Sequence, residues 1–409
     1  MVAMQLLSRA GWNRLWVTGL CLVVWRSLEQ IAVPGFNPSL GRLLDLPSST
    51  PLEAIGASIP FASNSIGAMG IGPYVDALII MTLVRFASRN VRSVESGADG
   101  PRRLLRWTRA LAILLALGQA YGYTVLMQNT FPPGLPSLDW FGRLVVMLAM
   151  TTGTVTLIFL ADVMDELGLG FGNGAFLIYA LAPVGIEAHR LAEIFGTAPS
   201  VEALYLPFAI WSGFSIAAVA VVVAALLAGR RVPMTSEENT SEWKPVQLRL
   251  LMSGVLRPPA YASALLFLPV LIANYSAGAN PGLQRWVVNF WTPYGPDPWT
   301  DAAYVLLNAG LVVALAYLVV RADAASRPVR PDLVAHVNRL IFIGGSLLAI
   351  IVVVLPVLEW NASRLAGRTF VMSGLNAALV ATIILAIVVG LERFGRRDDA
   401  APLLASPLP

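Results

Sequence analysis

Apolar residues fill long, nearly uninterrupted stretches of this chain, and polar residues gather in short segments between them. A bilayer core of about 30 Å needs about 20 apolar residues to be crossed as a helix. On this basis the sequence predicts ten spans, at residues 14–32, 68–87, 107–127, 141–162, 173–187, 204–229, 251–274, 302–320, 338–358 and 370–392. A further apolar piece at 55–62 is too short to cross. The pattern predicts an all-α membrane protein.

Composition supports this class, because 56% of the 409 residues are hydrophobic and 13% are charged. A soluble chain carries about 25% charged residues. The single cysteine, Cys21, excludes an internal disulfide framework and fits a small apolar residue of the first span. That first apolar run continues into Arg26 and Glu29 without a small-residue cleavage pattern, so we expect it to be retained as a span.

Arginine and lysine residues are distributed unequally between the two sides of the predicted spans. The richer side carries Arg9, Arg14, Arg85, Arg89, Arg92, Arg102, Arg103, Arg106, Arg109, Arg230, Arg231, Lys244, Arg249, Arg321, Arg327, Arg330, Arg339, Arg393, Arg396 and Arg397. The other side carries Arg42, Arg143, Arg190, Arg285, Arg364 and Arg368. Because basic loops stay in the cytoplasm, both termini are predicted to be cytoplasmic.

The stretch "MDELGLGFGNGAF" (residues 164–176) places carboxylates and glycines between two predicted spans. It could be a phosphate-binding loop, a hinge, or a tight turn at the membrane surface. A dinucleotide loop needs a strand before its glycines, whereas a membrane helix precedes this one. A tight turn or hinge entering the fifth span is therefore favoured, with Asn173 suited to a left-handed conformation. The sequence has no Walker loop and no G-x-S-x-G motif, and His189 and His336 stand alone. We therefore expect no cofactor, no metal and no enzymatic activity.

Six stretches, in order, carry a resemblance to a known family. They are "WRSLEQIAVPG" (25–35), "SIGAMGIGPYVDALIIMTLV" (65–84), "ESGADGPRRLLRWTR" (95–109), "TTGTVTLIFLADVMDELGLGFGNG" (151–174), "LRLLMSGVLRPPAYASALLFLPVLIA" (248–273) and "RPVRPD" (327–332). The second contains a G-I-x-P-Y motif at Gly70, Ile71, Pro73 and Tyr74, and the fourth ends in a glycine-rich turn. The chain resembles the SecY family, the central subunit of the protein-translocation channel.

The resemblance implies a fold of ten transmembrane helices in two inverted five-helix halves around an hourglass pore, with a short plug helix. The halves would be residues 1–200, with spans one to five and the plug, and 201–409, with spans six to ten. The implied function is to move unfolded secretory or membrane polypeptides across the membrane or laterally into it. The implied location is the bacterial cytoplasmic membrane.

The family closes its pore with an apolar ring and a plug. The ring positions that match here are Ile71, Val75, Ala175, Tyr179, Ala260 and Leu379. The alternative for these residues is ordinary lipid-facing or packing positions. Their small or polar members suggest a ring that is looser than one of the family's branched aliphatics, or one that is sealed differently. The plug matches "GASIPFASNS" (56–65), with Ile59, Pro60, Phe61 and Ala62 at its centre. An ordinary re-entrant or interfacial loop is the alternative.

The family's lateral gate opens between spans two and three and spans seven and eight. Its polar candidates here are Asp76, Thr82, Gln119 and Ser263. Hydrogen bonds between membrane helices contribute about 0.6 to 2 kcal/mol, which is weak enough to break when a signal helix enters. Structural packing favours the same residue types. A carboxylate at membrane depth is a functional candidate by default, and Asp76 would face a water-filled funnel or, alternatively, relay protons.

The resemblance also implies partners, because nothing in the chain hydrolyses a nucleotide. These are SecE-like and SecG-like small membrane subunits, a SecA-type motor or the ribosome, signal-sequence-bearing polypeptides and the lipid bilayer. Arg330, Arg231 and Arg102 are the candidate docking residues. Their alternative role is that of a solvated basic face.

One other function class fits part of the sequence, and a second does not. Glycine- or proline-broken helices and one midplane acid, Asp76, also suit a secondary transporter of a small solute. An intramembrane hydrolase would need a nucleophile and base at recognisable spacing, and the sequence offers none.

Overall fold

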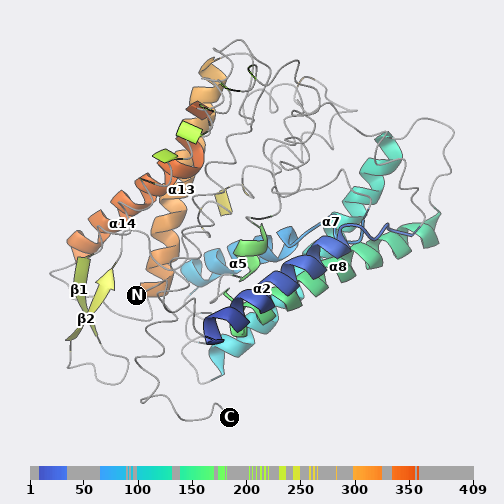
Figure 1. Cartoon of the computed structure of the whole chain (residues 1–409), viewed down its shortest axis with the longest axis horizontal. Coiled ribbons are helices and arrows are strands. Elements are labelled where there is room, and N and C mark those ends of the chain that lie inside the picture. Colours follow the sequence, from blue (N-terminus) through green and yellow to red (C-terminus); the bar gives the residue numbers. More distant parts are fainter. Residues whose placement is uncertain are drawn as a thin grey trace.

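The computed structural model describes residues 9–34, 65–88, 91, 94, 99–130, 139–169, 174–179, 181, 202, 205, 209, 212–213, 216–217, 220, 230–235, 243–248, 258, 261–262, 265, 282, 298–324, 334–354 and 357–358. Figure 1 shows the elements that they form. The helices are α2 (Arg9–Leu28), α5 (Gly72–Ala87), α7 (Gly100–Thr130), α8 (Trp140–Glu166), α13 (Pro298–Ala324) and α14 (Val334–Ala349). The strands are β1 (Arg230–Thr235) and β2 (Trp243–Leu248).

The described helices fall on the predicted spans, with ends set by local chemistry. Asp139 caps α8 by accepting a hydrogen bond of 2.7 Å from the Gly142 amide, as expected of an N-cap carboxylate. The second predicted span begins at 68, but α5 begins at Gly72, because the chain before it is a tight turn in which Gly70 has a φ of 57°. Glycine adopts this left-handed conformation at little cost, and Pro73 then suits the first helical turn.

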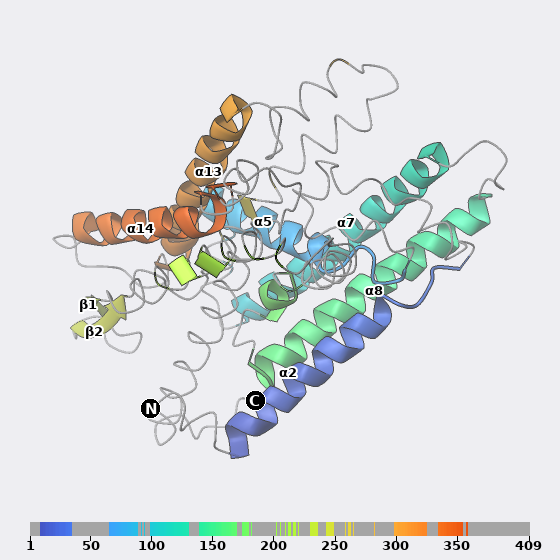
Figure 2. The same ribbon diagram turned by 45° about the horizontal axis from the view of Figure 1, so that its top comes forward.

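Two groups of helices make up the described molecule. Helices α2 and α8 lie side by side in both views, and α7 packs against α5 and α8 (Figures 1 and 2). Helices α13 and α14 pack against each other, and α14 continues into a π-helical segment, Ile350–Val354. In the sequence, Pro356 follows two residues after the end of that segment. Helix α5 also contacts α13, which joins the two groups.

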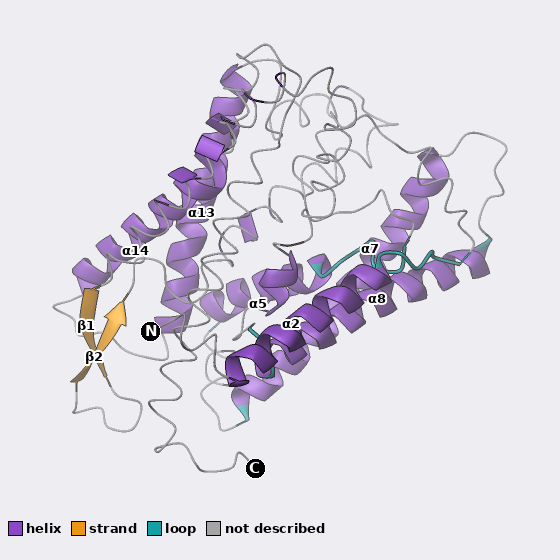
Figure 3. Ribbon diagram, in the orientation of Figure 1, coloured by secondary structure: helices purple, strands orange, loops and turns teal. Residues whose placement is uncertain are grey.

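A β-hairpin between the sixth and seventh predicted spans was absent from the all-α prediction. Strands β1 and β2 lie beside each other in Figure 3. They pair antiparallel, with Arg231 opposite Gln247 and Pro233 opposite Pro245. Proline is unfavourable inside a strand because it has no amide hydrogen to donate to the neighbouring strand. The two prolines therefore argue against strands in a sequence-based prediction. The hairpin lies on the α13 and α14 side of the molecule in both views.

Apolar surface covers much of the outside of the helices. Among the described residues, two helical segments are long and apolar enough to cross a membrane by length and composition, Trp140–Glu166 and Ala302–Val319. Large aromatic side chains lie exposed at opposite ends of the antiparallel pair α2 and α8, with Trp12 and Trp16 near the start of α2 and Trp140 at the start of α8. Such aromatic rings at helix ends are typical of membrane–water interfaces.

Candidate functional site

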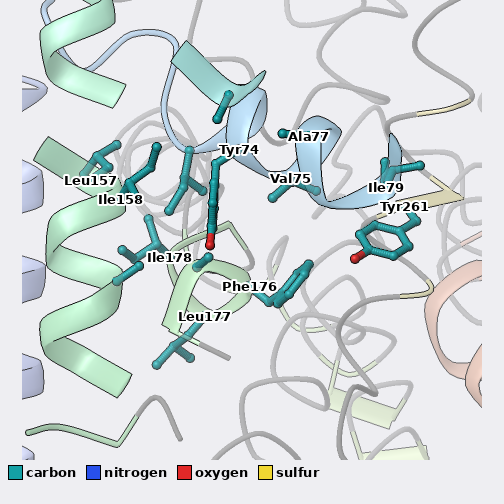
Figure 4. Close-up of a cluster of buried hydrophobic side chains, with 14 of the residues drawn as sticks. Tyr74, Val75, Ala77, Ile79, Leu157, Ile158, Phe176, Leu177, Ile178 and Tyr261 are labelled. Carbon is teal, nitrogen blue, oxygen red and sulfur yellow. The ribbon is translucent and has the colours of Figure 1, made fainter. Parts of the chain in front are cut away.

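The centre of the molecule is an apolar cluster built around α5 and the short helix 174–179 (Figure 4). Ile71, Val75 and Ala175, three of the predicted ring residues, are buried here with exposed fractions of 2%, 0% and 5%. Tyr179 is partly buried against the same cluster. The structure therefore brings together ring candidates that are about 100 positions apart in the sequence. Ala260 and Leu379 lie outside the described residues.

Aromatic side chains that were not predicted as site residues complete this cluster. The ring of Phe176 meets the ring of Tyr261 edge-on, with centroids 5.9 Å apart and an interplanar angle of 65°. Tyr74 of the G-I-x-P-Y motif is buried beside them, and its side chain extends toward Ile178 in Figure 4. Edge-to-face aromatic pairs add stability beyond the area they bury. The central apolar cluster is therefore packed partly with aromatic rings.

Backbone hydrogen bonds join the end of the first span to the turn before α5. The amide of Ile66 donates to the Ile31 carbonyl at 2.9 Å, and the amide of Gly67 donates to the Leu28 carbonyl at 3.2 Å. Ala32 and Ser65 form an isolated antiparallel bridge. Residues 35–64 between them include the plug candidates Ile59, Pro60, Phe61 and Ala62, which lie outside the described residues. The residues that flank this segment in the sequence, Ala32 and Ser65, therefore lie together.

The same turn packs closely against α8. Thr154 Oγ1 donates to the Gly70 carbonyl at 3.1 Å. A Cβ atom at Gly153 would lie 2.1 Å from the Ile66 carbonyl oxygen, so no larger residue fits while the turn keeps its place. This close approach fixes the start of α5, and with it Ile71, relative to α8.

The predicted gate residues have different surroundings. Gln119 Nε2 of α7 donates to Asp76 Oδ2 of α5 at 2.8 Å. Thr82 Oγ1 donates to the Leu78 carbonyl of its own helix at 2.7 Å. Ser263 lies outside the described residues. The structure therefore joins Asp76 to Gln119, whereas the Thr82 hydroxyl bonds its own helix.

The glycine-rich turn after α8 lies at the arginine-rich end of the helices. Arg109 Nη2 of α7 is 2.7 Å from Asp162 Oδ2 of α8. Asp165 Oδ1 accepts a hydrogen bond of 2.7 Å from the Gly174 amide, so a carboxylate caps the helix that carries Ala175 and Tyr179. Glycines 170 and 172 and Asn173 lie outside the described residues. Carboxylates at the end of α8 therefore bind an arginine of α7 and a backbone amide beyond the turn.

The predicted docking arginines lie in three places. Arg102 is exposed in the first turns of α7, and Arg231 belongs to β1. Arg330, between α13 and α14, lies outside the described residues. Within the described part of the chain, no group of three or more His, Cys, Asp or Glu side chains is close enough to hold a metal ion.

Comparison with known proteins identifies the family of the chain. The SecY family model matches residues 65–334. The protein translocase subunit SecY of Helicobacter pylori is 27% identical over 329 residues, which cover 76% of this chain and 74% of that protein. The SecY subunit of Corynebacterium glutamicum is 26% identical over 391 residues, covering 83% and 85% of the two chains.

Solved structures show the same fold at lower sequence identity. A structure of a protein-conducting channel matches with a TM-score of 0.61 and 16% identity, covering 97% of this chain and 95% of the other. Sec61 in the canine ribosome–channel complex matches with the same TM-score, identity and coverage. The architecture is therefore the all-α SecY/Sec61 channel fold. The chain belongs to the SecY family and is a multi-pass, non-enzymatic protein-conducting channel subunit.

Proposed function

We propose that the chain passes unfolded polypeptides through a pore between its two halves, residues 1–200 and 201–409, each made of five spans in inverted orientation. The proposed location is the bacterial cytoplasmic membrane, with both termini in the cytoplasm. The excess of arginine on one side of the spans supports this orientation. The contact of α5 with α13 supports a meeting of the two halves at the pore.

The proposed seal of the resting pore is a collar, the apolar cluster around Ile71, Val75, Ala175 and Tyr179, completed by Ala260 and Leu379. An apolar constriction blocks ions because water leaves it. The observation that carries the proposal is the burial of Ile71 and Val75 in one cluster with Ala175, although Ala175 comes from a different span. Such a dry contact is suited to a closed channel that opens when a polypeptide separates its walls.

The proposed plug is the segment around Pro60. In the sequence it lies between Ala32 and Ser65, which are joined by an isolated β-bridge. A structure with a similar fold, at a TM-score of 0.61 and 15% identity, belongs to a study in which the SecY plug domain stabilises the closed channel and maintains a membrane seal. Anchoring both ends of the segment beside Ile71 would let the plug reach the pore without being lost from it.

The proposed lateral gate lies between α5 with α7 on one side and α13 with the segment of Tyr261 on the other. The contact between α5 and α13 crosses this seam, and buried apolar residues of both helices, such as Ile79 and Leu315, belong to the central cluster. Apolar contacts of this kind separate readily before a hydrophobic signal helix, because lipid and signal offer equivalent contacts. The proposed polar residues of the gate are Asp76, Thr82, Gln119 and Ser263.

The proposed partners are SecE-like and SecG-like small subunits and either a ribosome or a SecA-type motor. Relatives of the same fold are bound to ribosomes, including canine Sec61 and the yeast Ssh1 complex. Arg102, Arg231 and Arg330 are the proposed docking residues, and Arg231 belongs to the hairpin at one side of the molecule. Basic segments of this kind suit RNA phosphates or acidic protein surfaces.

A reconstituted transport assay tests this proposal. The purified chain, with any small subunits that copurify, is placed in lipid vesicles with a signal-bearing precursor and a motor or ribosome fraction. We expect precursor protected from protease only in vesicles that contain the chain. Replacing Val75 by Asp should place a charge in the collar and increase ion leakage, whereas Val155→Asp on the exposed face of α8 should not leak. Equal protection in vesicles without the chain would contradict the proposal.

A further inference from the structure

Helix α2 is hydrogen-bonded to the turn that leads into the fifth span. The amide of Leu169 donates to Thr18 Oγ1 at 2.9 Å. Arg14 Nη1 donates to the Gly168 carbonyl at 2.8 Å. The turn thus gives one hydrogen bond to α2 and accepts one from it, over a sequence separation of about 150 residues. This reciprocal pair of bonds fixes both the position and the rotation of the turn.

The hydroxyl of Thr18 is used twice in this contact. Besides accepting from Leu169, it donates to the Arg14 carbonyl at 2.9 Å. Thr18 is buried, with an exposed fraction of 7%. A buried donor or acceptor without a partner is costly, so an apolar residue of the same shape would leave the Leu169 amide unpaired.

The contact also depends on the absence of a side chain at Gly168. A Cβ atom there would lie 2.7 Å from Thr18 Oγ1 and 2.9 Å from the Met164 carbonyl oxygen. Both distances are too short for carbon and oxygen to coexist. Glycine at position 168 therefore leaves the room that the contact between the turn and Thr18 needs.

A third hydrogen bond joins α2 to the chain beyond Tyr179. Arg26 Nη2 donates to the Leu181 carbonyl at 3.3 Å, and Arg26 also pairs with Glu29. Helix α2 therefore contacts the chain before Ala175 through Thr18 and after Tyr179 through Arg26. Between these contacts lies the short helix 174–179, whose residues belong to the central apolar cluster.

We infer that Thr18 and Arg14 are positioning residues, which hold the fifth span so that Ala175 and Tyr179 meet Ile71 and Val75 in the closed collar. This inference rests on the proposed function of the collar residues as a pore seal. Neither Thr18 nor Arg14 is assigned a contact with the translocating polypeptide. Their loss should loosen the seal of the resting channel without removing the path for a chain.

A set of substitutions at Thr18 tests the inference. Thr18→Val keeps the shape and removes the hydroxyl, and Thr18→Ser restores it. Thr152→Val is the matched control, because Thr152 is exposed and its hydroxyl donates to the Leu148 carbonyl of its own helix. Each variant is studied as the full chain in lipid vesicles, with its copurifying subunits.

Two measurements are made on each variant. Amide hydrogen exchange in peptides containing Leu169 should become about fivefold faster in Thr18→Val, since one hydrogen bond that opposes local opening is lost. Ion leakage through the idle channel should rise in the same variant, while precursor transport stays within about twofold of the parent. Thr18→Ser and Thr152→Val should match the parent in both measurements.

We call the hydrogen bonds between α2 and the turn at Gly168 and Leu169 the clamp. The outcomes distinguish a failure of the clamp from a failure of the proposed channel function. Unchanged exchange at Leu169 in Thr18→Val overturns the hydrogen-bonded clamp. Faster exchange with unchanged leakage overturns the positioning role. A parent chain that transports no precursor contradicts the proposed function instead, and the exchange measurement then still reports on the clamp alone.

Discussion

Gln119 of α7 holds the carboxylate of Asp76 on α5 through a hydrogen bond of 2.8 Å. Both residues were predicted to belong to the lateral gate, and the structure places both of them on the same side of the proposed seam. The pair therefore joins α5 to α7 and leaves the seam between α5 and α13 free to separate. We expect α5 and α7 to move as one unit when a signal helix enters.

Removing Gln119 should weaken that unit. Gln119→Leu takes this hydrogen bond from the Asp76 carboxylate, and we expect a loss of about 1–2 kcal/mol in the free energy of unfolding. Denaturation in mixed detergent micelles measures it. Asp76→Asn, which keeps an acceptor oxygen for Gln119, is the control and should lose less. Equal stability of parent and Gln119→Leu would show that the bond contributes nothing.

Asp76→Asn also separates the channel from a secondary transporter. A passive path for polypeptide needs no titrating acid, so precursor transport should remain within about twofold of the parent. A proton-coupled transporter depends on its midplane carboxylate. Solute-dependent proton flux that disappears in Asp76→Asn would support the transporter, and it is measured with a pH-sensitive dye in the same vesicles.

Gly153 of α8 should not tolerate a larger side chain. In Gly153→Ala the new Cβ would meet the Ile66 carbonyl oxygen at 2.1 Å, so the turn before α5 must shift and the bond from Thr154 to Gly70 is lost. Overpacking of this kind costs about 1–3 kcal/mol. Thermal unfolding in detergent measures the change.

The control for that experiment is another glycine inside a helix. At Gly118 of α7, an added Cβ atom would have no neighbouring atom within 4 Å, and alanine is the better helix former by about 0.5–1 kcal/mol. Gly118→Ala should therefore be neutral or stabilising. Destabilisation of both variants by the same amount would contradict the role assigned to the close approach at Gly153.

The ion pair between Arg109 and Asp162 should contribute little and respond to salt. Its side chains are 40% and 33% exposed, and such pairs contribute about 1 kcal/mol or less. A double-mutant cycle with Arg109→Ala and Asp162→Ala should give that coupling in low salt and a smaller one at about 1 M salt, where the Debye length is about 3 Å. Arg106→Ala, on the same exposed helix start, controls for loss of charge. Coupling that is unaffected by salt would contradict an exposed pair.

The predictability of the fold follows from what one sequence encodes locally. The apolar run at 141–162 predicted α8, and the helix extends only slightly beyond it, from Trp140 to Glu166. The run at 107–127 missed the first turns of α7, because its arginines are polar yet good helix formers. The turn at Gly70 could not be read from hydropathy, since conformation there is set by a left-handed glycine.

The candidate site was less predictable, because its bonds join distant positions. Ile71 and Val75 were predicted as ring positions from the resemblance to the family, and the structure buries them with Ala175. The bond from Leu169 to Thr18 had no signal in the pattern, since a threonine in a membrane helix usually bonds its own backbone. Phe176 and Tyr261 likewise meet only through the fold.

The central claim is that a polypeptide passes the collar at Ile71. A photo-crosslinking amino acid replaces Ile71 in cells or vesicles that hold a precursor stalled partway across the membrane. The control is the same amino acid at Ile113 of α7, an isoleucine on the outer surface that is 40% exposed. We predict that Ile71 captures the stalled chain and that Ile113 does not. Capture at neither position, under conditions in which an established SecY channel captures the same precursor, would contradict the claim.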